Sequence, residues 1–160
     1  MLRLSKKCEY ALIALQYIAM HQGRVVSAKE IAEHYGLSFE FIAKTLQLLT
    51  RRKLIASHQG AAGGYVLMRL PTQISVAEVI EAVEGKPRIV QCCGEGNGDM
   101  CSMNGRCTIQ MPMAILQRRI EEVLASTTLQ HITLSDTSQY HVVHKPRIHS
   151  HEQHSNQLIS

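Results

Sequence analysis

Four of the five cysteines lie in one short stretch of the sequence, from Cys92 to Cys107. The residues between them are mostly glycine, asparagine, aspartate and serine, with two methionines, and they can bury little apolar surface. Thiolates are the soft ligands that iron–sulfur clusters require, and gaps of five to seven flexible residues let a loop wrap a cluster. Zinc ribbons use closer cysteine pairs. The spacing favours an iron–sulfur cluster, with a zinc site or unliganded thiols as alternatives.

The composition indicates a globular chain with one domain and short appendages. Hydrophobic residues make up 45% of the 160 residues, which is enough for a core. The longest apolar run, Ala11–Met20, is interrupted by Gln16 and is too short to span a bilayer. Export signals are not apparent, so we expect a cytoplasmic protein with no membrane partner. Thiols stay reduced in the cytoplasm, where clustered cysteines bind metal more often than they form disulfides.

The net charge of +4 is distributed unevenly along the sequence. Residues 1–90 hold 12 Lys and Arg against 7 Asp and Glu, which gives +5. Residues 91–160 hold 5 against 6, which gives −1. A basic N-terminal half is compatible with binding to nucleic acid, and also with a merely solvated basic surface.

Three helices are expected in the first third of the chain. Residues 5–21 have the apolar spacing of a helix. Ser27 and Glu30 have the spacing of a capping box, which would open a short second helix. A third helix is expected over residues 38–53, with Ser38 as its cap. The side chains expected on the buried side of this third helix are Phe41, Ile42, Leu46 and Leu49.

A hairpin and a fourth helix are expected next. Two short strands, 54–58 and 65–68, flank a loop of small residues. Ser75 and Glu78 have the spacing of a second capping box, which would open a helix over 76–83.

A longer helix is expected over 109–126, after the cysteines. Its apolar stripe indicates either a dimer seam or packing on the first helix. From about residue 135 the sequence turns polar, and we expect a disordered tail. Weak metal binding by its histidines is the alternative. These histidines are His141, His144, His149, His151 and His154.

The order of these elements predicts a mainly α winged helix-turn-helix with a small β-hairpin wing and a long C-terminal dimerisation helix. The expected divisions are a DNA-binding domain over 1–90, a cluster-binding loop over 91–108, a dimerisation helix over 109–134 and a His-rich tail over 135–160.

In this arrangement, the N-terminal end of the helix after the turn enters the major groove. Gly36 supplies the turn, because glycine permits a positive φ. Several side chains of this helix could contact DNA, and each could instead be only a helix cap or a solvated charge. The candidates for contacts with DNA from this helix are Ser38, Phe39, Glu40, Lys44 and Gln47. Candidate phosphate contacts are Thr45, Arg51, Arg52 and Lys53, and the wing adds Gln59 and Gly60.

Several stretches together resemble the IscR, NsrR and RirA family of bacterial iron–sulfur transcriptional regulators. They are LSKKCEYAL, GLSFEFIAKTLQLL, GGYVL, ISVAEVIEAVEG and three spaced cysteines, and the resemblance covers residues 1–134. It implies a homodimer that binds a palindromic operator in double-stranded DNA and whose DNA affinity follows the state of an iron–sulfur cluster. A 2Fe-2S cluster is the first expectation and a 4Fe-4S cluster is the alternative. No enzymatic activity is implied.

The resemblance also implies the cluster ligands. The three cysteines would be Cys93, Cys101 and Cys107, whose gaps of seven and five residues are similar to those of RirA-type proteins. Cys92 is the alternative to Cys93. Gln110 stands where IscR-type proteins have a histidine ligand, so the fourth ligand must come from elsewhere.

Two residues near the start of the chain could complete the cluster site, from the same subunit or from the partner. Glu9 stands where NsrR-type proteins have a carboxylate ligand, and the neighbouring Cys8 is its alternative. Simpler readings are a solvated carboxylate for Glu9 and a small buried hydrophobe for Cys8.

Gln59 is a second departure from the family, because many members have an arginine at this position of the wing. A function of another class is also compatible with the sequence. The chain could be a metal-binding or metal-carrying protein that uses its cysteine loop without specific DNA binding. Affinity for an operator would distinguish the two functions.

Overall fold

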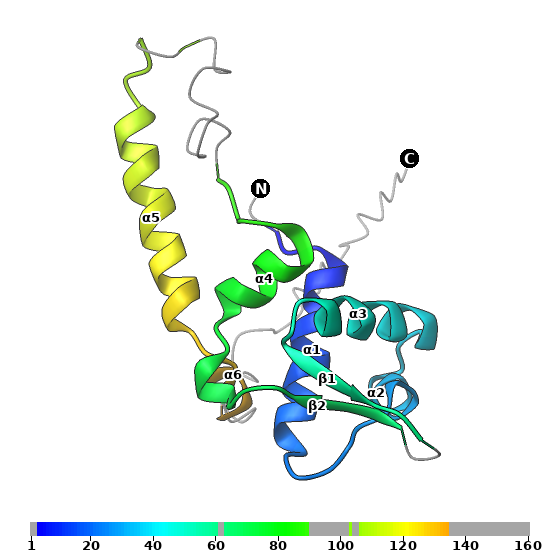
Figure 1. Cartoon of the computed structure of the whole chain (residues 1–160). Coiled ribbons are helices and arrows are strands. Elements are labelled where there is room, and N and C mark those ends of the chain that lie inside the picture. The colour runs from blue at the N-terminus through cyan, green and yellow to red at the C-terminus, as the bar shows by residue number, and fades with distance from the viewer. Residues whose placement is uncertain (1–2, 61–62, 90–102, 104–105, 135–160) are drawn as a thin grey trace, which may run out of the picture.

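A computed structural model describes residues 3–60, 63–89, 103 and 106–134 of the chain. Predictions for Cys92, Cys93, Cys101 and the tail over 135–160 lie outside these residues. The described part is mainly α-helical with one antiparallel hairpin, so the predicted fold class is confirmed (Figure 1). The elements are α1 (Lys6–Met20), α2 (Ala28–Tyr35), α3 (Phe39–Arg51), β1 (Ile55–His58), β2 (Gly64–Leu67), the 3-10 helix η1 (Pro71–Gln73), α4 (Val76–Glu84), α5 (Gln110–Ser126) and α6 (Leu129–Leu134).

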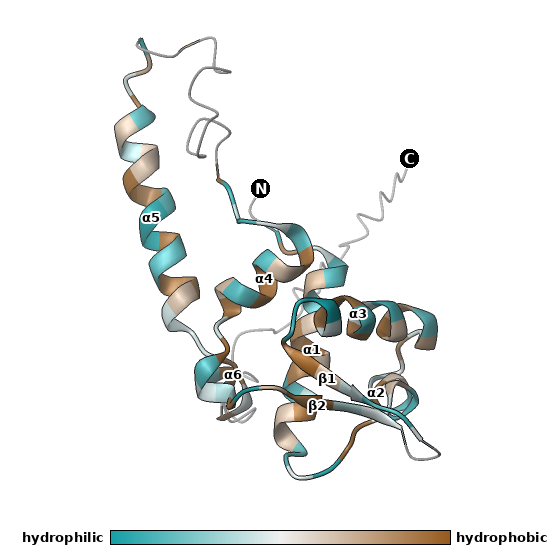
Figure 2. Ribbon diagram, viewed as in Figure 1, coloured by the Kyte–Doolittle hydropathy of each residue, from teal (hydrophilic) through white to brown (hydrophobic). Residues whose placement is uncertain are grey.

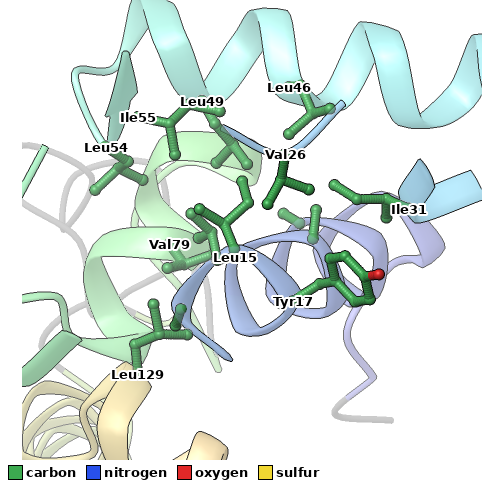
Figure 3. Close-up of a cluster of buried hydrophobic side chains, with 14 of the residues drawn as sticks. Leu15, Tyr17, Val26, Ile31, Leu46, Leu49, Leu54, Ile55, Val79 and Leu129 are labelled. Carbon is green, nitrogen blue, oxygen red and sulfur yellow. The ribbon is translucent and has the colours of Figure 1, made fainter. Parts of the chain in front are cut away.

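Helix α1 lies at the centre of the hydrophobic core. Ser5 caps it, because its side chain accepts a hydrogen bond from the backbone N–H of Cys8. Leu15 is fully buried and lies between residues of α3 on one side and Val79 and Leu129 on the other (Figure 3). Apolar side chains from the whole length of the described chain therefore meet on one helix.

The turn between α2 and α3 has the geometry of a helix-turn-helix. Gly36 adopts the left-handed conformation, with a φ of 63° and a ψ of 34°. The backbone N–H of Leu37 donates to the carbonyl of Ala32 at 2.9 Å, which closes the end of α2. Ile31 and Ile42 are fully buried and hold the two helices together.

Three of the predicted details in this region are wrong. Ser38 precedes α3 but makes no side-chain capping hydrogen bond. The predicted capping box at Ser27 is only half formed, because the Glu30 carboxylate binds Tyr17 and Arg24 instead. Phe41 was expected in the core, but 51% of it is exposed and its ring meets the edge of another aromatic ring.

The Glu30 carboxylate fixes α2 against the end of α1. It accepts from the Tyr17 hydroxyl at 3.0 Å and from the Arg24 guanidinium at 2.5 and 3.0 Å. The hydrogen bond from Arg24 is the main reason that the pKa of Glu30 falls to about 2. The carboxylate therefore stays charged, and keeps both partners, throughout the neutral pH range.

The wing is a hairpin in which β1 pairs antiparallel with β2. Tyr65 of β2 also forms two backbone hydrogen bonds with Val26, from the connection between α1 and α2, at 2.8 and 3.0 Å. A Cβ atom at Gly64 would lie only 2.4 Å from the carbonyl oxygen of Val26. Only glycine therefore allows this close approach of the two backbones.

Two helices occupy the range 109–134: α5 agrees with the helix predicted over 109–126, and α6 follows it. Helix α5 ends at Ser126, and α6 returns to pack on α1 and η1. The N–H of Leu129 donates to the carbonyl of Ile74 at 2.8 Å, and the side-chain amide of Gln16 donates to Ile132 at 3.0 Å. The C-terminal end of α5 is therefore fastened to the winged-helix core.

Helix α5 packs on α4 with one side only. Met113, Gln117, Ile120 and Leu124 lie along that side and are buried or half-buried. Part of the apolar stripe predicted from the sequence therefore packs on α4, and Leu124 packs against the cluster that Cys8 of α1 forms with Val76 and Ile80 of α4. No helix of the described residues is long and apolar enough to cross a membrane.

The contact between Gly64 and Val26 predicts a large effect for a small substitution. We expect Gly64→Ala to lower the free energy of unfolding by at least about 2 kcal/mol, because the new methyl group collides with backbone that cannot move aside. Gly36→Ala is the matched control: a Cβ there meets no atom within 4 Å, and only the positive φ costs about 1 kcal/mol. Urea denaturation measures both. Equal losses in the two variants would contradict the packing described here.

Candidate nucleic-acid interface and cysteine segment

One side of α3 is open to solvent along its whole length. Glu40, Lys44, Gln47 and Arg51 are exposed on this side, and the residues buried on the opposite side hold the helix on the core. Spacings of three and four residues place these four side chains in one band. We call this band, together with Ser38, Phe39 and Ala43, the reading face.

The structure excludes one of the predicted phosphate contacts. Thr45 is only 1% exposed, and its hydroxyl donates to the carbonyl of Phe41 at 2.8 Å within the helix. It cannot reach DNA. Arg52 and Lys53 are exposed at the end of α3, where Lys53 has an unusual positive φ of 58°.

A hollow of about 300 Å³ separates the reading face from the wing. Gln47, Thr50 and Arg51 line it from α3, and Ser57 and Tyr65 line it from the hairpin. These side chains carry one positive charge and four hydrogen-bonding groups, and none of them is acidic. A phosphate group matches this chemistry.

Ser57 and Tyr65 were missed by reasoning from the sequence. They are cross-strand partners in the hairpin, so they reach the hollow together. The alternation of side chains along a strand was the available signal, but it does not say which side of the wing faces α3. Immediately after β1, Gln59 and Gly60 are both exposed, as a contact with DNA would require.

Cys107 is the one predicted cluster cysteine that the structure describes. It is a free thiol of intermediate exposure and lies three residues before α5. Gln110, which replaces the histidine of IscR-type proteins, is the first residue of α5. Within the described ranges, no three His, Cys, Asp or Glu side chains are grouped so that they could hold a metal ion.

Cys8 is fully buried in a small cluster with Val76 and Ile80. Burial raises the pKa of its thiol to about 11, and the carboxylates of Glu84 and Glu9 add to the effect. At neutral pH this side chain is therefore a protonated thiol, whereas iron binds the thiolate.

Glu9 is half-buried in the first turn of α1, where its carboxylate pairs with the ammonium group of Lys6 at 2.5 Å. The start of α1 lies close to the end of α4, far from the start of α5 (Figure 1). A single chain therefore does not bring Glu9 and Cys107 together.

Gln117 connects α5 to the segment that leads into the cysteines. This side chain is only 5% exposed. Its carbonyl oxygen accepts from the backbone N–H of Ile89 at 2.8 Å, and its amide donates to the carbonyl of Pro87 and to Glu121, each at 2.7 Å. We call this set of hydrogen bonds the Gln117 clamp. It was not predicted, because hydrogen bonds over such a sequence separation leave no periodic signal.

Comparisons with known proteins agree with this arrangement. Residues 4–134 match the Rrf2 family, which is described as iron-dependent transcriptional regulators. The chain is 32% identical over 136 residues to the HTH-type transcriptional regulator IscR of Sodalis glossinidius, with 84% of this chain and 81% of that protein covered. It is 33% identical over 129 residues to a putative HTH-type transcriptional regulator of Azotobacter vinelandii, with 80% and 77% covered.

Two solved structures share the fold. The global cysteine regulator CymR of B. subtilis matches with a TM-score of 0.72 and 28% identity, over 83% of this chain and 97% of that chain. IscR of T. potens matches with a TM-score of 0.64 and 31% identity, over 82% and 85%. These relatives are transcriptional regulators and not enzymes. The similarity favours a DNA-binding function over the alternative of a metal-carrying protein. The chain belongs to the Rrf2 family of DNA-binding transcriptional regulators.

Proposed function

We propose that this regulator acts as a homodimer whose DNA affinity is set by an iron–sulfur cluster bound by its cysteine segment. The observation that carries the proposal is the Gln117 clamp. Ile89, just before the cysteine segment (residues 90–107), is held at the middle of α5, and Cys107, the last residue of the segment, lies three residues before the same helix. Gln110 and Gln117 are about 10 Å apart along a helix. Strain in the segment therefore acts directly on α5.

The position of α5 affects the reading face because packed helices connect α5 to α3. Helix α5 packs on α4, and its C-terminal end is fastened to α6, which packs on α1. Helix α1 in turn packs on α3, which carries the reading face. Two positions of α5 would thus give two arrangements of the reading face, and cluster occupancy would shift the population between them.

The donors fit a cluster bound by three thiolates and one weaker ligand. Cys93, Cys101 and Cys107 are the proposed cysteine ligands, with Cys92 as the alternative to Cys93. Bound iron and sulfide would supply sensitivity to oxidation, nitric oxide or iron supply. We favour 2Fe-2S, with 4Fe-4S as the alternative.

Glu9 is the better candidate than Cys8 for the fourth ligand. Its carboxylate is partly exposed and pairs with Lys6, whereas the Cys8 thiol is packed in the core, where burial raises its pKa to about 11. Because Glu9 lies far from the start of α5 in one chain, it would reach the cysteines of the second copy in the dimer (Figure 1).

The dimer contact would be formed by the side of α5 that faces away from α4. Hydrophobic residues recur along α5 although the helix stands apart from the core (Figure 2). Met111 is 71% exposed and Val123 is 63% exposed, and Ile115 and Leu116 lie between them. A solvent-exposed hydrophobic surface of this kind on one helix is typical of an interface between subunits.

The hollow beside the reading face would receive a backbone phosphate. Arg51 supplies the charge, and Tyr65 and Ser57 supply hydroxyl groups from the wing. Such contacts position a protein on DNA without reading the sequence. Lys44, Gln47, Gln59 and Gly60 would contact the groove around it.

The cluster assignment predicts a spectroscopic result. We expect Cys101→Ala and Cys107→Ala to abolish the visible absorbance and bound iron of anaerobically purified protein, because each removes a thiolate ligand. Cys8→Ala is the matched control and should keep both. Native mass spectrometry of the wild type reports the cluster type and the dimer together. Iron-free wild-type protein, or unchanged spectra in both ligand variants, would refute the cluster.

The dimer assignment predicts an effect of charge on one side of α5. We expect Ile115→Glu to raise the dimer dissociation constant at least about a hundredfold, because the dimer would bury the new carboxylate twice. Ala114→Glu places the same charge on the exposed side of α5 opposite Val123 and should have little effect. Analytical ultracentrifugation measures both. If both variants dissociate the dimer to the same extent, this side of α5 does not form the interface.

The phosphate assignment predicts a change in salt dependence. We expect Arg51→Gln to weaken binding to all DNA sequences alike and to reduce the slope of log affinity against log salt by about one. Arg118→Gln removes a charge from α5 and should leave the slope unchanged. Tyr65→Phe should weaken binding at constant slope, because only a neutral hydroxyl is lost. An unaltered slope for Arg51→Gln would exclude the contact.

A further inference from the structure

The reading face has an apolar part that neither the fold nor the phosphate contact uses. Phe39, Ala43 and Gln47 follow one another at intervals of four residues along α3 and lie in one row. Phe39 is 55% exposed, and Ala43 is half-buried beside it. Two apolar side chains thus occupy the N-terminal half of a face that is otherwise polar.

The two exposed phenylalanines of α3 differ in their surroundings. The Phe41 ring lies on the other flank of the helix, with its edge towards Tyr10 at a centroid distance of 5.8 Å. Among the described residues, no aromatic ring packs against Phe39 in this way. Phe39 lies at the margin of a hollow of about 370 Å³ that faces α2. Much of its ring remains in water, so a partner that covers it would be favoured.

The position of Phe39 determines which partner can cover the ring. It is the first residue of α3, and side chains on a helix lean towards its N-terminus. The ring therefore extends from the end of the helix that enters the major groove. One ring and one methyl group make a patch too small to dock another protein. The C5-methyl group of thymine is the apolar group that the floor of the major groove presents.

We propose that Phe39 and Ala43 read the C5-methyl group of a thymine in each half-site of the operator. This inference rests on the DNA binding proposed above and assigns a base preference to it. Ala43 contributes by its small size, which lets the base edge approach the helix. Glu40, next to Phe39 on the same face, remains free to accept from an adjacent cytosine amino group.

The test removes the methyl group from the DNA without any other change. Operator sequences are first selected from a random library with the full-length, anaerobically purified protein. Each thymine of a selected site is then replaced singly by deoxyuridine, and affinity is measured by fluorescence anisotropy at fixed salt. We expect the replacement at one position in each half-site to lower the affinity about fourfold. This is the effect of losing the transfer free energy of one buried methyl group.

The variants connect that loss to Phe39. In Phe39→Ala the deoxyuridine effect should disappear, and Phe39→Leu should retain part of it. Phe41→Ala, the matched control on the other flank, should retain all of it. Circular dichroism checks that every variant is folded.

Failure of this inference is distinguishable from failure of the proposed function. Tight, salt-dependent binding to a selected operator, with deoxyuridine neutral at every position or with its effect unchanged in Phe39→Ala, would overturn thymine reading alone. Failure to select any sequence would overturn specific DNA binding, and thymine reading with it.

Discussion

The burial of α1 is the constraint on which the rest of the structure depends. One side of α1 packs on α3, which carries the reading face, and the other packs on α4 and α6, which hold the base of α5. Leu15 lies between the two groups (Figure 3). Because protein interiors are close-packed, neither group can shift on α1 without a response from the other. Glu9, the proposed cluster ligand, lies in the first turn of the same helix.

The second constraint is the Gln117 clamp at the border of the cysteine segment. A buried amide with three partners is costly to rearrange, because the Gln117 side chain would lose its hydrogen bonds while it stays away from water. The clamp therefore fixes Ile89 on α5. Movement that begins in the cysteines would be transmitted to α5 rather than absorbed by the connection.

Much of the fold was predictable because its signals are local. The Ser75 capping box, the Gly36 turn and the glycine-rich hairpin each depend on residues close in sequence, and the structure confirms all three. The errors arose where distant partners compete for a side chain. Arg24 and Tyr17 take the Glu30 carboxylate from its capping box. The packing of α6, the hollow beside Tyr65 and the Gln117 clamp were not predicted, because they depend on tertiary contacts, which periodicity does not encode.

In the proposed regulation, the cysteine segment changes DNA affinity through α5. The most direct test measures operator affinity of anaerobic protein before and after chelation of iron, in the wild type and in Gln117→Ala. The account predicts a change of about tenfold or more in the wild type, within the range of typical allosteric coupling, and a much smaller change when the clamp is absent. Equal affinities of the wild type with and without iron, or an undiminished change in Gln117→Ala, would contradict it.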